Sequence, residues 1–477
     1  MRNLTGEYPT PDAPPRLADE TLWYTEHTAL LISTIKWAFL GAGAGLCVGY
    51  GTRVFLWAIA HSGAVVALIT RSAFPAYWLL PLALPLCVWL IRTFAPDARG
   101  HGTEAVIAAV HRDSGRINWR IAPVKLFATV VTLAFGGSVG KEGPAAQIGA
   151  SLTSLFADML KLNDPDRRRL VICGISAGFA AVFGTPVSGA LFGIEVLYLG
   201  RIDYTVIFPA LVAGIVGHLV CGVKAPFPVL QDAFGTVGQM RIVLTSIASG
   251  SLFGLVALLL IEFMRTLDRV VKRAETHPFV IAAVGGLVLV GVYAVGGVQY
   301  AGLGTDTIDG VLTGAVTVSA FAFVIKMIAT GVTLESGGSG GILTPIFFIG
   351  VTSGAAMAPL FGVNPRLLAA FGFVSVLAAA ANTPLAAAVM AIELLPAHEG
   401  VYAALAAATA FLMVGHRSVY ASQKLGFSKS AALHVPLGGN IGDVDSSTLR
   451  IREGTLTDRV HRYGRSFTRK DTDDSES

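Results

Sequence analysis

Two charged side chains, Lys141 and Glu142, stand among glycines in the segment GGSVGKEGP at residues 136–144, with apolar sequence on both sides. A nucleotide-binding loop is excluded, because that motif needs four residues between its first glycine and the Gly-Lys pair, followed by Ser or Thr. The glycines and Pro144 instead suit the start of a helix. The free N–H groups of a helix N-terminus attract anions. The segment therefore predicts an anion site, with Glu142 as a carboxylate that competes with the anion.

Glu142 is a candidate gate and proton acceptor. When protonated it can swing away from the anion site, and when ionised it can occupy the site itself. Ionisable residues inside membrane segments are functional candidates by default. The alternative is that Lys141 and Glu142 form an ion pair at a membrane surface. The sequence offers no metal-ligand cluster, catalytic triad or carboxylate pair with enzymatic spacing, so we expect no enzyme, metal site or cofactor.

The composition is that of an integral membrane protein. Of 477 residues, 53% are hydrophobic and 14% are charged, whereas about a quarter of a soluble domain is charged. Apolar stretches recur along the chain, beginning with separate ones at 30–50 and 54–70, and several are long enough to cross a bilayer. The net charge of +4 is small and argues against a nucleic-acid partner. We therefore expect a multi-pass chain in a lipid bilayer.

The sequence contains a duplicated half. A shift of 201 residues aligns 124–144 with 325–345, and a shift of 198 aligns 174–197 with 372–395. The matches include Lys, Pro and Glu positions, which apolar composition alone does not produce. Duplicated transporters bind substrate where the repeats meet, at the N-termini of interrupted helices. GGSGGILTP at 337–345 is therefore predicted to begin a second helix that points at the same anion.

Four further charged residues are equivalent between the repeats. Glu195 and Glu393 match, and this symmetry favours a structural role, such as capping a helix end, over a role in transport. Lys125 and Lys326 also match. We expect Lys125 to supply positive potential along the ion route, with snorkelling to an interface as the alternative.

The chain divides into five predicted segments. These are a polar N-terminal segment at 1–27, a first transmembrane half at 28–266, a linker at 267–278, a second transmembrane half at 279–425, and a polar tail at 426–477.

Three motifs, GKEGPAAQIG, AGFAAVFGTPVSGALFGIE and GGSGGILTP, resemble the helix-end motifs of the CLC family of chloride channels and proton–chloride exchangers. The resemblance covers about residues 28–425. It implies an all-α homodimer in which each subunit has its own pore and two inverted halves of tilted, membrane-interrupted helices. It also implies the prokaryotic type without a C-terminal regulatory domain, a location in the plasma (inner) membrane, and both termini in the cytoplasm.

The resemblance assigns an outer anion position around the first motif. Glu142 matches the gating glutamate of the family. Lys141 stands where the family usually has Arg. The N–H groups of Gly140, Lys141 and Gly143 would face the outer anion.

The resemblance assigns a central anion position to the motif GGSGGILTP. Ile342 and Leu343 would offer N–H groups there, and the Tyr420 hydroxyl would face the same anion. His101 stands where the family has a serine, and its imidazole either donates an N–H to the anion or points away. Val196 stands where many exchangers have an internal proton glutamate, which leaves proton coupling open.

The sequence thus predicts chloride transport through a CLC-type pathway that is gated by Glu142. Proton/chloride exchange is favoured over a passive chloride channel. Further alternatives are a CLC-type transporter of fluoride or nitrate and a cation-coupled solute carrier. The predicted partners are chloride, protons in the case of exchange, the lipid bilayer and a second copy of the chain; the family also includes voltage-gated members.

Overall fold

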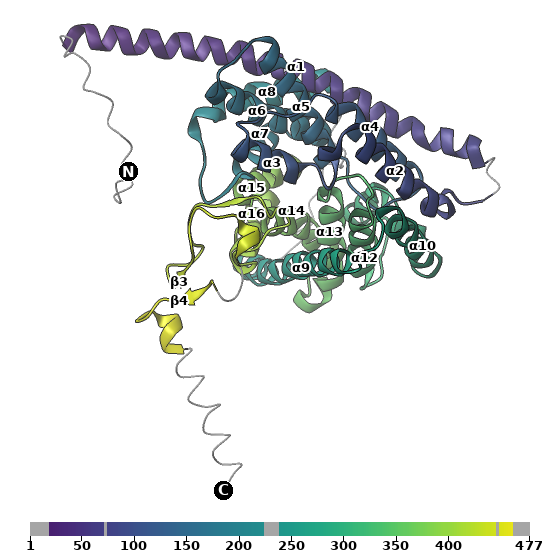
Figure 1. Ribbon diagram of the computed structural model, residues 1–477. Coiled ribbons are helices and arrows are strands. Elements are labelled where there is room, and N and C mark those ends of the chain that lie inside the picture. Colours follow the sequence, from purple (N-terminus) through teal and green to yellow (C-terminus); the bar gives the residue numbers. More distant parts are fainter. Residues whose placement is uncertain (1–18, 71–73, 224–237, 445–447, 461–477) are drawn as a thin grey trace.

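The computed structural model describes residues 19–70, 74–223, 238–444 and 448–460. The predicted polar segment 1–27 and the end of the tail therefore lie largely outside the described residues. Helices dominate the fold, as expected for an all-α membrane protein, and six helices within the described residues are long and apolar enough to cross a membrane. Figure 1 shows the first helix lying along one side of a compact bundle, with the C-terminal segment extending from the opposite side.

The helices of the first half have the following bounds: α1 Asp19–Thr70, α2 Leu80–Phe94, α3 Thr103–Arg112, α4 Ile121–Ala134, α5 Glu142–Met159, α6 Asp164–Phe183, α7 Pro186–Glu195 and α8 Ile207–Cys221. Those of the second half are α9 Gln239–Arg273, α10 Pro278–Gly296, α11 Thr305–Thr313, α12 Ala322–Glu335, α13 Leu343–Phe361, α14 Pro365–Ala381, α15 Pro384–Leu394 and α16 Ala397–Met413. The described residues also form two short strand pairs. Strands β1 Tyr198–Leu199 and β2 Lys424–Leu425 pair in parallel, and β3 Leu433–His434 and β4 Arg450–Ile451 pair antiparallel.

The two halves correspond to α1–α8 and α9–α16. Helix α1 packs along α8 and α6, and α9 packs in the same way along α16 and α14. The halves therefore divide between Cys221 and Gln239. The predicted linker at 267–278 is wrong as a boundary, because α9 continues to Arg273 and already belongs to the second half. Its polar composition reflects the end of a long helix rather than a connection between the halves.

A pseudo-two-fold axis relates the halves. The Ser138 N–H donates to Thr333 Oγ1 at 3.1 Å, and the equivalent Ser339 N–H donates to Thr132 Oγ1 at 3.0 Å. Each half thus offers the other the same contact. Such reciprocal contacts are the signature of two-fold symmetry, and they agree with the inverted repeat that the family resemblance implies.

Helix α1 is a single helix of 52 residues. The sequence suggested separate apolar stretches at 30–50 and 54–70, but the intervening residues contain no proline and continue the helix. At 1.5 Å per residue α1 is about 78 Å long, more than twice the thickness of the hydrocarbon core. It lies along the surface of the first half (Figure 1) and exposes large apolar side chains such as Leu30 and Phe39.

Glycines interrupt both central helices. After α4 the chain turns at Gly136 (φ +87°), and after α12 it turns at Gly337 (φ +94°). Residues other than glycine rarely adopt such a positive φ. Pro144 and Pro345 then lie in the first turns of α5 and α13, where a missing N–H costs little. These residues make α4–α5 and α12–α13 into pairs of interrupted helices, as predicted.

Two glutamates cap helices of the opposite half. Glu195 accepts hydrogen bonds from the N–H groups of Leu385 (3.0 Å) and Ala386 (2.8 Å) at the start of α15. Glu393 accepts equivalent bonds from the N–H groups of Val187 and Ser188 at the start of α7. The predicted structural role of both glutamates is confirmed.

Candidate anion site

The N-termini of α5 and α13 meet at the centre of the molecule. The Gly140 N–H donates to the Gly341 carbonyl at 2.6 Å, and the Gly341 N–H donates to the Gly140 carbonyl at 2.7 Å. This pair of bonds fixes the two helix starts side by side. It also corrects the prediction for Gly140, because the N–H of this residue is engaged by a carbonyl and does not face an anion in this conformation.

The carboxylate of Glu142 occupies the N-terminus of α13. It accepts hydrogen bonds from the Thr344 hydroxyl at 2.6 Å and from the Thr344 N–H at 3.1 Å. Ile342 and Leu343 precede Thr344, and their N–H groups have no intrahelical acceptor because they open the helix. The carboxylate therefore sits where a helix N-terminus would hold an anion.

Thr344 is the residue that the sequence reasoning missed. It is the repeat equivalent of Gly143, so the alignment of GKEGP with GILTP already placed a hydroxyl at the second residue of the helix. Threonine offers a side-chain donor in addition to its backbone N–H. The sequence prediction considered only backbone N–H donors in GGSGGILTP and therefore did not include the Thr344 hydroxyl.

Close backbone contacts bring the loop before α3 to the start of α5. A Cβ atom at Gly143 would lie 2.2 Å from the carbonyl oxygen of His101, and a Cβ atom at Gly102 would lie 2.6 Å from the Gly143 carbonyl oxygen. Gly102 also has φ +85°. Only glycine fits at both positions, and the contact places His101 beside the anion site.

The side chain of Lys125 binds the loop before α3. Its ammonium donates to the carbonyls of Ala98 at 3.1 Å and Gly100 at 2.5 Å, and its side chain is fully buried. Lys326 binds the equivalent loop of the second half through two carbonyls. Snorkelling to an interface is therefore wrong for both lysines. The positive potential that we expect from Lys125 stays a prediction, and its position next to His101 is consistent with it.

His101 and Tyr420 face each other beside the site. Their ring centroids are 6.1 Å apart. The Tyr420 hydroxyl and the His101 Nδ1 are both buried, and neither has a hydrogen-bond partner among the described residues. Buried polar atoms are nearly always satisfied, so these two donors or acceptors fit a site for an additional polar species such as an anion.

A cavity of about 480 Å³ opens next to these residues, and we call it the vestibule. Its lining includes Arg99, His101, Glu104, Arg265, Glu335 and Ile342. It therefore reaches the first residue before α13 and carries charges of both signs. The volume is ample for several water molecules.

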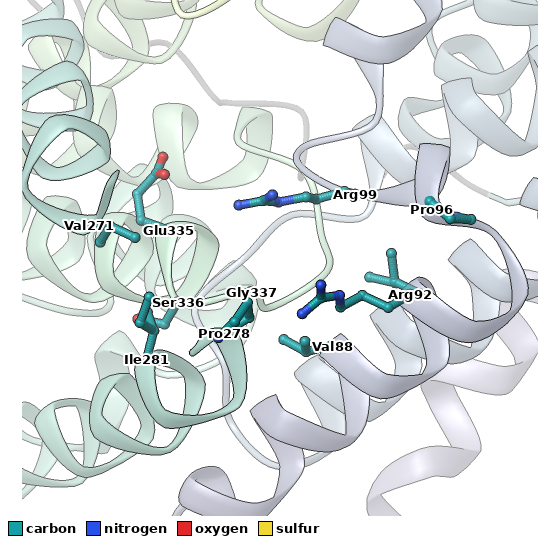
Figure 2. Close-up of a pocket in the computed structure, with 11 residues that line it drawn as sticks. Val88, Arg92, Pro96, Arg99, Val271, Pro278, Ile281, Glu335, Ser336 and Gly337 are labelled. Atoms are coloured by element: carbon teal, nitrogen blue, oxygen red, sulfur yellow. The ribbon is translucent and has the colours of Figure 1, made fainter. Parts of the chain in front are cut away.

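A second cavity of about 280 Å³ adjoins the vestibule and shares Arg99, Glu335 and Gly337 with it. Figure 2 shows Arg99 extending toward Glu335 across this cavity, while Arg92 points in from α2. The remaining lining is mainly apolar. Arg92 and Arg99 thus place positive charge beside the vestibule, which favours the approach of anions.

The other predicted site residues lie as follows. Lys141 is half-buried at the start of α5. Its carbonyl accepts a hydrogen bond from the Ala145 N–H at 3.0 Å, and within the described residues its side chain makes no hydrogen bond or ion pair. Val196 is fully buried, and its carbonyl accepts a hydrogen bond from Gln423 Nε2 at 3.0 Å. Val196 does not line the vestibule. Position 196 therefore supplies no ionisable group to a proton that enters through the vestibule.

Comparison with known proteins places the chain among anion transporters. Residues 83–415 match the family described as voltage gated chloride channel. A chloride/fluoride channel protein of Pseudomonas syringae pv. tomato is 36% identical over 445 residues, which cover 91% of this chain and 96% of that protein. The H(+)/Cl(-) exchange transporter ClcA of Cronobacter sakazakii is 27% identical over 395 residues, with 78% and 82% covered.

Solved structures show the same architecture. The crystal structure of a CLC-type fluoride/proton antiporter superposes with a TM-score of 0.76 at 26% identity, covering 82% of this chain and 98% of that one. The structure of a slow cyanobacterial Cl-/H+ antiporter superposes with a TM-score of 0.68 at 21% identity, covering 79% and 94%. The second match supports the fold alone.

Proposed function

Because the chain belongs to the voltage-gated chloride channel (CLC) family, we propose that this multi-pass membrane protein exchanges a halide for protons, with chloride as the first candidate substrate. The observation that carries the proposal is the position of the Glu142 carboxylate at the N-terminus of α13, where Thr344 donates two hydrogen bonds to it. A halide and the ionised carboxylate compete for the same donors.

This competition links the halide to the proton. Ionised Glu142 accepts the bonds from Thr344 as an anion would, and it blocks the pathway. A proton on the carboxylate removes its charge and weakens these charge-assisted bonds. The neutral side chain then leaves the site and a halide takes its place. Each return of ionised Glu142 expels a halide, so the two species move in opposite directions.

Fluoride is the second candidate substrate. The specific observation is His101, which stands where the family has serine and lies beside Tyr420 with an unpartnered Nδ1. Fluoride is small and concentrates its charge, so it gains more than chloride from strong N–H and O–H donors. Two relatives also carry fluoride in their descriptions, the channel protein of Pseudomonas syringae and the fluoride/proton antiporter of known structure.

The proposal includes a homodimer in the plasma membrane. Each subunit carries both interrupted helix pairs, so each has a complete pathway of its own. A cross-linking experiment on the protein in native membranes tests the dimer. Recovery of monomer alone would contradict it.

The exchange is tested with proteoliposomes loaded with chloride or fluoride. Halide efflux and external pH are recorded together for wild type, Glu142→Gln and the control Glu335→Gln, which replaces a vestibule carboxylate that does not touch Thr344. We expect halide efflux with proton uptake in wild type and in the control, and loss of proton uptake in Glu142→Gln. Proton uptake that persists in Glu142→Gln would refute the role of this residue. The ratio of fluoride to chloride efflux decides between the two substrates.

A further inference from the structure

A cluster of unpartnered polar atoms lies beside the vestibule, and two of its members, His101 and Glu104, line this cavity. It comprises His101 Nδ1, Thr103 Oγ1, Glu104 Oε2 and the Tyr420 hydroxyl, all of them buried and without a hydrogen-bond partner in the described part of the chain. Leaving a buried polar atom unpaired costs about 1–3 kcal/mol. Several such atoms in one place indicate that additional polar species pass or reside there.

Glu104 is the acidic member of this cluster. Its Oε1 accepts hydrogen bonds from the Ser422 N–H at 2.8 Å and from the Ser422 hydroxyl at 2.5 Å. These bonds fix the orientation of the carboxyl group. The other oxygen, Oε2, stays free to bind and release a proton. Ser422 follows Tyr420 by two residues, so the carboxyl group is anchored to the segment that carries the anion-facing hydroxyl.

The other carboxylates of the vestibule are less suited to this task. Asp268 forms an ion pair with Lys272 at 2.6 Å. Glu335 also lines the adjoining cavity, where Arg99 extends toward it (Figure 2). Val196 supplies no carboxyl group at all. Among the described residues that line the vestibule, Glu104 is therefore the carboxyl group that belongs to the unpartnered cluster.

The duplication of the chain provides a comparison for Glu104. A shift of 202 residues aligns GHGTE at 100–104 with GLGTD at 302–306, so Asp306 is the equivalent acidic residue of the second half. Asp306 is exposed, whereas Glu104 is half-buried and its Oε2 atom is buried. His101 is replaced by Leu303 in that half. The acidic position is thus shared, but only the first half combines it with a buried cluster beside the anion site.

We propose that Glu104 is the residue that loads protons from the vestibule and supplies them to Glu142. This inference rests on the proposed exchange function. A hydronium ion of the vestibule gives a proton to Glu104 Oε2, which leaves a water molecule behind and makes the carboxyl group neutral. The proton then leaves Oε2, crosses the hydrated cluster beside His101 and Tyr420, and ends on the Glu142 carboxylate. Glu104 is ionised again, and neutral Glu142 vacates the anion site.

The proposal is tested by the proton-to-halide ratio in proteoliposomes. Glu104→Gln keeps an oxygen that accepts the bonds from Ser422, but its amide cannot carry a proton in this way. We expect halide efflux close to wild type and a fall of roughly 100-fold in proton uptake, the effect of removing a positioned acid–base group. Glu104→Asp, which restores a carboxyl group, should recover part of the proton uptake. Asp306→Asn and Glu335→Gln serve as matched controls and should keep the wild-type ratio.

The outcomes separate the two proposals. If wild type couples halide to protons and Glu104→Gln retains the full ratio, the role of Glu104 is refuted while the exchange function stands. If wild type moves halide without protons, the exchange function itself fails. Equal loss of halide and proton fluxes in folded Glu104→Gln would assign the residue to the halide pathway and also overturn the proposal. If the Gln variant is not recovered as folded protein, Glu104→Ser is compared with Glu104→Asp in the same assay.

Discussion

Replacing Tyr420 by phenylalanine should weaken halide binding without weakening the fold. The hydroxyl of Tyr420 is fully buried and has no hydrogen-bond partner among the described residues. In the absence of halide, no hydrogen bond to a described residue offsets the cost of burying it. When a halide is bound, we expect the hydroxyl to donate to it.

The size of both effects follows from the chemistry of the hydroxyl. A hydrogen bond to a charged group contributes about 1.5–3 kcal/mol. Its loss in Tyr420→Phe should therefore raise the dissociation constant of the halide by roughly 10- to 150-fold. Removing an unpaired buried hydroxyl relieves a cost of about 1–3 kcal/mol, so the unfolding temperature in halide-free buffer should stay constant or rise.

Tyr293 provides a matched control on the same fold. It is also buried, with 2% of its surface exposed, but its hydroxyl donates to the Gly136 carbonyl at 2.8 Å. Tyr293→Phe should therefore lower the unfolding temperature and leave halide affinity unchanged. Calorimetric titration and thermal unfolding in detergent measure both quantities. Unchanged halide affinity in Tyr420→Phe, or lower stability in halide-free buffer, would refute the reasoning.

Three further predictions follow from the packing. Gly143→Ala should abolish halide efflux, because its Cβ would lie 2.2 Å from a carbonyl oxygen, whereas Gly63→Ala has open space and should transport normally; equal efflux from both variants would contradict the close contact. Glu195→Ala should lower the unfolding temperature more than Glu393→Ala, because Glu195 caps its helix in a buried position and Glu393 is exposed; the opposite order would contradict the capping argument. Lys125→Met should slow halide efflux, because two loop carbonyls lose their donor, and efflux at the wild-type rate would argue against this lysine as a support of the site.

The interrupted helices and the duplication could both be predicted from the sequence. Glycines, prolines and repeat-equivalent polar residues are local features, and the turns at Gly136 and Gly337 appear where the motifs indicated. The symmetry of Glu195 and Glu393 likewise predicted a structural role that the hydrogen bonds confirm. These features could be predicted because each depends either on neighbouring residues in the sequence or on the equivalent residue of the other repeat.

Other features depend on contacts that no local pattern specifies. The boundary between the halves was misplaced, because polar residues at the end of α9 resemble a linker until the packing of that helix is known. The engagement of the Gly140 N–H by Gly341 required the relative position of two segments 201 residues apart. The partnership of Glu104 with Ser422 joins residues even further apart.

The reciprocal bonds between Gly140 and Gly341 have a consequence for the direction of transport. Through these bonds, the backbone segments of the two halves take up equivalent positions at the site. The side chains break this equivalence, since Lys141 and Glu142 of one half correspond to Ile342 and Leu343 of the other. His101 and Thr344 add to this difference, since they correspond to Leu303 and Gly143, so inside and outside are distinguished by side chains on a symmetric frame. Exchanging the two pairs alone would not produce a mirror-image gate, because the transferred glutamate would meet Gly143, which lacks the hydroxyl that Thr344 offers to Glu142.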